Sequence, residues 1–192
     1  MKKSKYLILN SFYFDFNDDL SEITIVKELF KNQNILDIFR FDKIKSIKNI
    51  QVDEENINFI YLPQNIEIID NFAFYINQIK ILDLSNCIKL KNIELGAFEE
   101  NQIKQLKLPE NIEIIDEFAF SDNQIKILDL SNCINLKTIK MWSFFKNQIK
   151  QLKLPKNIEI IEYSAFKNNQ IESLDLSNCI KLKNIREAAF RK

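Results

Sequence analysis

One skeleton of apolar residues recurs along most of the chain, over Ile57–Lys192. In Ile125–Gln148 it has the spacing I-x-x-L-x-L-x-x-C-x-x-L, and Ile103–Gln124 has the same spacing with asparagine in place of cysteine. The Leu-Pro pairs that begin at positions 62, 108 and 154 lie 46 residues apart (108 − 62 and 154 − 108), so coils of 22 and 24 residues alternate. The coils begin at Ile57, Ile79, Ile103, Ile125, Ile149 and Ile171. A repeat of this length predicts a solenoid, because each coil can bury its apolar face only against its neighbours.

The apolar spacing matches the leucine-rich-repeat signature. The 22-residue coils carry LPxNIEII, and the last part of every coil contains a small residue followed by phenylalanine. In these motifs residues 57–192 resemble the BspA-like, treponemal-type leucine-rich repeat. The resemblance implies an α/β repeat solenoid: a right-handed superhelix with a concave parallel β-sheet and short helical or 3-10 turns on its convex side. It also implies binding to proteins or surfaces, commonly as a bacterial cell-surface adhesin, and brings no catalytic residues.

Two columns of side chains are expected inside the solenoid. The Leu-x-Leu stretch of each coil alternates apolar and polar residues and should be a strand, and six such strands at ~4.8 Å would form one parallel sheet. The final turn of each coil should stack its phenylalanine in a column: Phe74, Phe98, Phe120, Phe144, Phe166 and Phe190. The small residue before each one should let the turns pack closely.

The turn sequence departs from the family in one respect. Where the family usually has glycine after the second apolar segment, this chain has Asp70, Glu94, Asp116, Lys140, Glu162 and Arg186. If that position needs a positive φ, these residues are strained, so we expect the turn to be remodelled toward ordinary helix.

Residues 1–56 lack a clear repeat and are predicted to be an N-terminal cap with one degenerate coil over Ile35–Asn56. A cap would cover the apolar edge of the first regular coil. Within it we expect strands over Tyr6–Leu9 and Phe12–Phe16 and a helix over Glu22–Lys31. The alternative is a separate binding or effector element.

The composition argues against several classes of function. Lys+Arg and Asp+Glu are both 27, so no net field attracts nucleic acid or an anionic membrane. A single glycine excludes Gly-rich phosphate loops, and the absence of histidine removes the commonest general base and metal ligand. No apolar run reaches the ~18 residues of a membrane span, and we read no export signal. These features predict no cofactor, no membrane insertion and a cytoplasmic location, whereas the family resemblance implies the cell surface.

The three cysteines and three asparagines at the equivalent position are expected to be structural. Cys87, Cys133 and Cys179 are two coils apart, or ~9.6 Å, beyond the ~7 Å Cα limit of a disulfide. We therefore predict buried thiols rather than a disulfide or a metal site. In the other coil type, an inward hydrogen-bond ladder is expected of Asn65, Asn111 and Asn157.

The outward residues of the Leu-x-Leu strands form the candidate ligand face. This face consists of Phe59, Tyr61, Ile81, Asp83, Gln105, Lys107, Ile127, Asp129, Gln151, Lys153, Ser173 and Asp175. Its alternating Asp and Lys also fit a self-neutralising ladder that keeps the strands in register, and both roles are compatible. Phe59 and Tyr61 are either contact anchors for a ligand or packed under the cap.

The last coil ends without a polar cap, so Ile171–Leu176 would be an open edge strand. An open edge predicts a truncated chain, further repeats beyond it, or end-to-end self-association.

These observations favour a non-enzymatic binding module for a protein or surface ligand. One alternative is an effector or enzyme whose activity lies in residues 1–56, where Asp15, Asp18 and Asp19 are the only acidic cluster. Another is a structural spacer.

Overall fold

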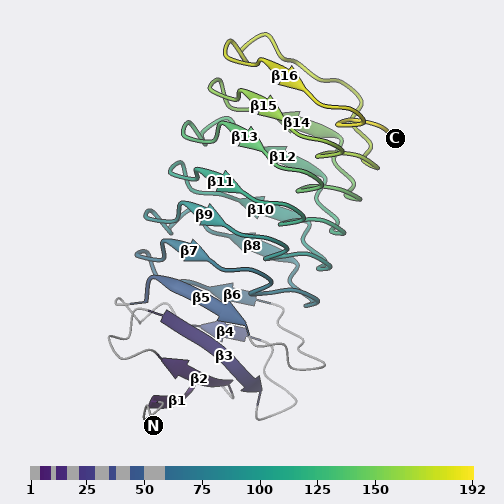
Figure 1. The fold of residues 1–192 in the computed structure, drawn as a ribbon. Helices are drawn as coiled ribbons and strands as arrows, with labels where there is room; N and C mark the ends of the chain where they lie inside the picture. Colours follow the sequence, from purple (N-terminus) through teal and green to yellow (C-terminus); the bar gives the residue numbers. More distant parts are fainter. Residues whose placement is uncertain (1–4, 10–11, 17–21, 29–34, 38–43, 50–58) are drawn as a thin grey trace.

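The computed structural model describes residues 5–9, 12–16, 22–28, 35–37, 44–49 and 59–192 of the chain. Successive coils stack into a solenoid, with β1 and β16 at opposite ends of the stack (Figure 1). Two rows of strands run along the stack, because each coil before the last contributes one strand from its Leu-x-Leu stretch and a second from the apolar segment that follows. The last coil contributes only the second, β16. No helix that could cross a membrane occurs in the described part of the chain.

The second apolar segments form the continuous sheet, which has ten strands in the order β1-β2-β3-β5-β7-β9-β11-β13-β15-β16. The first three strands are antiparallel, and every pairing from β3 onward is parallel. Their bounds are β1 Lys5–Leu9, β2 Phe12–Phe16, β3 Glu22–Glu28, β5 Ser46–Asn49, β7 Ile68–Ile69, β9 Asn92–Ile93, β11 Ile114–Ile115, β13 Thr138–Ile139, β15 Ile160–Ile161 and β16 Asn184–Ile185.

The Leu-x-Leu strands do not form the single sheet predicted for them. They bond only in pairs, β4 with β6, β8 with β10 and β12 with β14. Each break follows a 22-residue coil, in which Pro63, Pro109 or Pro155 lies two residues after the strand. The bounds are β4 Ile35–Asp37, β6 Phe59–Tyr61, β8 Ile81–Asp83, β10 Gln105–Lys107, β12 Ile127–Asp129 and β14 Gln151–Lys153.

Two predictions about the ends of the array were wrong. The segment 22–28 is strand β3 rather than a helix, because its β-branched residues suit a pleated surface and its antiparallel neighbour β2 supplies hydrogen-bond partners. The segment Ile171–Leu176 is not a strand, and β16 ends the continuous sheet instead.

End-to-end self-association stays a prediction, as does the boundary at residue 56. The strands expected over 6–9 and 12–16 are confirmed as β1 and β2.

The phenylalanine column is confirmed. Rings of successive coils stack with centroids 5.1 to 5.4 Å apart and planes within 11° of parallel, from Phe74 to Phe190. The first five rings are fully buried. The small residues before them are buried as well, so the turns approach closely enough for the rings to touch across coils.

The turns that carry this column are not helical in the described part of the chain, which corrects the expected helical or 3-10 turns. Alternate backbone amides of each turn donate to the next coil: Phe72 N to Leu95 O at 2.9 Å, Phe74 N to Ala97 O at 2.8 Å and Ile76 N to Glu99 O at 3.1 Å. A helix would need these amides for carbonyls of its own turn. Bonding between coils therefore replaces helix formation.

Left-handed residues make this alternation possible. In each turn the residue two before the phenylalanine has a positive φ, at Phe72, Gly96, Phe118, Trp142, Ser164 and Ala188. The residue two after it has a positive φ in five coils, at Ile76, Glu100, Asp122, Lys146 and Asn168. The acidic and basic residues suspected of strain, Asp70 and its equivalents, lie outside the left-handed region. The prediction of a turn remodelled toward helix was therefore wrong, because the left-handed position lies two residues later.

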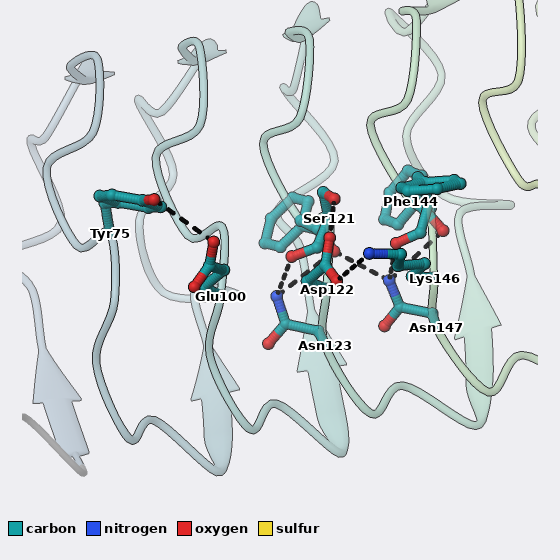
Figure 2. Close-up of polar contacts among 10 residues, drawn as sticks. Tyr75, Glu100, Ser121, Asp122, Asn123, Phe144, Lys146 and Asn147 are labelled. Atoms are coloured by element: carbon teal, nitrogen blue, oxygen red, sulfur yellow. Dashed lines mark hydrogen bonds and ion pairs between the residues drawn. The ribbon is translucent and has the colours of Figure 1, made fainter. Parts of the chain in front are cut away.

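A buried asparagine ladder holds the turns, but it lies at residues that sequence reasoning missed. Its members, all 5 to 7% exposed, are Asn77, Asn101, Asn123, Asn147 and Asn169. Asn123 Nδ2 donates to Phe98 O at 2.8 Å, Ser121 O at 3.1 Å and Phe120 O at 3.3 Å. Its Oδ1 accepts from Ile103 N at 2.9 Å. Figure 2 shows Asn123 and Asn147 in equivalent places of successive coils.

The asparagines predicted to form the ladder have a different role. Asn111 and Asn157 are half-buried, and each donates a hydrogen bond to the preceding coil, at Ile88 O (2.6 Å) and Ile134 O (2.9 Å). Those carbonyls lie in the loop of two successive turns, residues 85–89 and 131–135, where the 24-residue coil has two more residues than the short coil, and we call this loop the bulge. The 22-residue coil thus binds the bulge of its longer neighbour.

The ladder predicts a large difference between two asparagine substitutions. Asn123→Leu leaves the Ile103 amide and several carbonyls unsatisfied in the core, at about 1–3 kcal/mol for each buried group. Asn111→Leu is the matched control, because it removes one bond at a half-buried position. We expect Asn123→Leu to lower the urea midpoint of unfolding far more than the control. Equal midpoints would contradict the ladder.

A second prediction concerns Gly96, whose φ is +59°. A Cβ there would lie 2.5 Å from Cε1 of Phe72, so Gly96→Ala adds a clash to left-handed strain of roughly 1–2 kcal/mol. Ala188 occupies the equivalent position with φ 57°. Ala188→Gly relieves that strain. It also raises the conformational entropy of the unfolded chain, which costs roughly 0.4–1 kcal/mol of stability and offsets part of the gain. Thermal unfolding should show a loss of stability for Gly96→Ala and none for Ala188→Gly.

Candidate functional site

The Leu-x-Leu strands present two outward columns, which together we name the LxL face. In β8, β10, β12 and β14 the middle leucine is buried, and the residues on either side of it are exposed. Ser173 and Asp175 continue the columns beyond the strands and are also exposed. Tyr61 lies on the face, whereas the side chain of Phe59 lies outside the described residues. The backbone thus places the predicted residues on one surface.

The first column alternates apolar and amide side chains. Ile81 is 46% exposed and Ile127 is 60% exposed, with exposed Gln105 and Gln151 on the strands bonded to theirs. Tyr61, in the second column, is 54% exposed. The face therefore carries apolar groups that the solenoid core does not use.

The charged column forms separate pairs instead of a continuous ladder. Lys107 Nζ lies 2.9 Å from Asp83 Oδ2, and Lys153 Nζ lies 3.1 Å from Asp129 Oδ2. Among the described residues no ion pair joins Lys107 to Asp129, which are on strands that are not bonded to each other. Each pair is solvent-exposed and contributes at most about 1 kcal/mol.

The aspartates of this column also hold the turn that follows them. Ser85 donates from its backbone N and its Oγ to Asp83 Oδ1, at 3.1 and 2.6 Å, and Ser131 does the same to Asp129. Burial acts to raise the pKa of the Asp83 carboxyl, but the bonds from Ser85 and Lys107 outweigh it and hold the pKa below its usual value. The threefold motif D-L-S-N-C was the sequence signal for this role. These carboxylates are committed to the fold and are less available to a ligand.

The cysteines are the buried, unpaired thiols that the sequence predicted. Burial, with a smaller effect of Asp83 and Asp129, raises the pKa of Cys87 and Cys133 to about 11. Such thiols stay protonated near neutral pH and are poor nucleophiles. No group of three or more His, Cys, Asp or Glu side chains suited to a metal occurs in the described part of the chain.

Polar contacts also link the turns next to the phenylalanine column (Figure 2). Tyr75 Oη donates to Glu100 Oε1 at 3.3 Å, and Lys146 Nζ lies 3.2 Å from Asp122 Oδ1. Burial and the neighbouring carboxylates Glu100 and Asp122 raise the pKa of Glu99 to about 7. These groups form a row along the turns that carry the phenylalanine column, and they contribute to packing between coils.

The same turns also carry a partly exposed aromatic row. Trp142 is half-buried, with ring centroids 4.8 Å from Phe118 and 6.2 Å from Tyr163. These contacts give Trp142 a role in packing between coils. The acidic cluster Asp15, Asp18 and Asp19, considered for an enzyme, lies outside the described side chains.

Comparison with solved structures agrees with this fold. The chain is similar to a leucine rich cell surface protein from Faecalibacterium prausnitzii A2-165, with a TM-score of 0.54 and 16% identity over 97% of this chain and 55% of that one. A leucine-rich repeat protein from Bacteroides ovatus ATCC 8483 gives a TM-score of 0.31 and 16% identity over 86% and 57%. At these identities the first likeness shows the fold alone, and the chain spans little more than half of either protein.

A search of curated proteins gave no match. A family model, described as "BspA type Leucine rich repeat region (6 copies)", matches residues 23–135 and 88–192. The two matches together extend from β3 to the last residue, so they include the region in which the apolar spacing is blurred as well as the regular coils. The chain belongs to the BspA-type leucine-rich-repeat family.

Proposed function

We propose that this chain is a non-catalytic binding module that contacts a protein or a cell-surface ligand through the LxL face. The observation that carries the proposal is the exposure of Ile81 and Ile127 on strands whose core contacts are already complete. Large apolar side chains left in water on a fixed surface are available for burial by a partner. Burial of one isoleucine contributes about 1.5–3 kcal/mol.

The rest of the face suits recognition. Tyr61 is an aromatic group with a polar tip, the type of side chain that is enriched at interface hot spots. Charges of both signs lie beside the isoleucines, in the ion pairs Asp83–Lys107 and Asp129–Lys153. Such charges contribute more to the orientation of a bound partner than to its affinity. A stack of coils bonded through buried asparagines presents these groups with little loss of conformational entropy on binding.

A location at the cell surface is part of the same proposal. It rests on membership of the BspA-type family and on the likeness to a protein described as a leucine rich cell surface protein. The concave curvature of the LxL face and the right-handed superhelix, expected from the family, belong to this proposal as well. If the chain is instead a structural spacer, substitution of the exposed isoleucines should leave its binding to other molecules unchanged. This difference gives a direct test.

The test compares two double variants. Ile81→Ser with Ile127→Ser removes the apolar groups of the LxL face. Ile88→Ser with Ile134→Ser is the matched control, because these residues are 56% and 46% exposed on the bulges outside that face. We expect the face variant to weaken binding by about tenfold per isoleucine, and the control to bind as the parent does.

The measurement is affinity capture from surface extracts of candidate host or neighbouring cells, followed by calorimetric titration of the captured partner. Retention of the same partner with equal affinity by the parent and both variants would contradict a contact through the LxL face, as a spacer predicts. Loss in both variants would show that the contact extends beyond that face to the bulges. Circular dichroism verifies that each variant keeps the sheet.

A further inference from the structure

One 24-residue coil departs from the other two around a surface hollow. The aligned segments read IKLKNIE from Ile88, INLKTIK from Ile134 and IKLKNIR from Ile180. A cavity of about 410 Å³ opens on the continuous sheet beside the middle segment, lined by Glu113, Ile114, Asn135, Lys137, Thr138 and Lys140. Asn135, Thr138 and Lys140 are the three positions at which the middle segment differs from the first. The changes are therefore concentrated at the hollow.

Lys137 belongs to a column of alternating charges but is left without an ion pair. Lys91 Nζ binds Glu113 Oε1 at 2.9 Å, and Lys183 Nζ binds Glu159 Oε2 at 2.6 Å. Those two carboxylates are the neighbours of Lys137 along the column, and each is held by a different lysine. Among the described residues, no carboxylate lies within 4.0 Å of the Lys137 ammonium.

Lys140 stands where the other two coils have partnered side chains. In the first coil Asn92 Nδ2 donates to Glu94 Oε1 at 3.1 Å, so that coil fills the position with its own carboxylate. In the third coil Arg186 Nε lies 3.9 Å from Glu162 Oε2. The middle coil has Lys140 in place of the acid and Thr138 in place of the amide. The carboxylate of the first coil is thus replaced by a second cation.

We propose that this hollow binds a compact oxyanion, a phosphate, sulfate or carboxylate group, between Lys137 and Lys140. The Thr138 hydroxyl and the Asn135 amide supply uncharged donors beside the two ammonium groups. Charge-assisted hydrogen bonds of this kind are stronger than neutral ones. Glu113 and Glu159 border the cations, so the local field suits one small anionic group and disfavours a nucleic-acid backbone.

The internal repeat supplies the test variants. Asn135→Lys, Thr138→Asn and Lys140→Glu together give the middle coil the sequence that the first coil already folds with. The probes are sodium phosphate, sodium sulfate and sodium acetate, titrated at constant ionic strength against chloride and followed by amide chemical shifts of residues 135–140. The parent chain should show saturable shifts with at least one probe, and the triple variant should bind about tenfold more weakly or worse.

A further variant controls for charge. Lys45→Gln removes a lysine of the same column that is ion-paired with Glu67, away from the hollow, and it should leave the affinity within about twofold of the parent. Retention of parental affinity by the triple variant would overturn the proposal, and so would shifts that chloride reproduces.

The probes separate the possible sources of the anion. Saturation by phosphate or sulfate indicates a tetrahedral group, saturation by acetate alone indicates a carboxylate, and saturation by none overturns the site. The hollow lies on the continuous sheet, whereas the proposed ligand face lies on the Leu-x-Leu strands. The Ile81/Ile127 double variant should keep the anion affinity, so this inference and the proposed function can fail separately.

Discussion

The structure depends on bonding between coils. A coil of this size cannot satisfy its own buried backbone, since its turns are not helical and its strands are two or three residues long over the regular repeat. The neighbours supply what is missing. Alternate amides of each turn donate to the next coil, and the buried asparagines join carbonyls of two turns to the amide of a third segment. Stacked phenylalanines fill the space that remains. Stability is thus a property of adjacent coils.

A difference of two residues between coil types organises both surfaces. The longer coil bulges at Ile88 and Ile134, and the shorter one binds the bulge through Asn111 and Asn157. Two Leu-x-Leu strands are hydrogen-bonded where a long coil connects them, and they are not bonded where a short coil connects them. The charged column therefore consists of separate Asp–Lys pairs and not of a continuous ladder. On the opposite sheet, the bulge at Ile134 adjoins the hollow that contains Lys137 and Lys140.

The sequence was sufficient for features that follow from periodicity. Apolar spacing predicted the solenoid, the phenylalanine column and the burial of the cysteines, because inward positions recur in every coil. The identity of the asparagine ladder depended on which of two asparagine sets points inward. The motif N-Q-I occurs in both coil types, at Asn77 through Asn169, whereas Asn111 has a counterpart only in the short coils. Attention to the motif shared by all coils would have identified the ladder.

Other features could not be read from periodicity. Which carbonyl an amide bonds to is decided by the neighbouring coil, so the turns were wrongly expected to be helical. Strand β3 was mistaken for a helix because Ile23, Val26 and Leu29 also fit a helical spacing, and only the partner β2 distinguishes the two. For the ligand face, the order of side chains was predictable, but the turn-holding role of Asp83 required the bonds from Ser85.

The binding of each bulge by the following short coil also restricts how such an array can change in length during evolution. Deletion of one coil would bring two coils of the same type together, leaving either a bulge carbonyl without its asparagine or an asparagine without its bulge. Duplication or loss of 46 residues keeps every such contact. The heritable unit of this protein is therefore a pair of coils, and its relatives should differ in length by whole pairs.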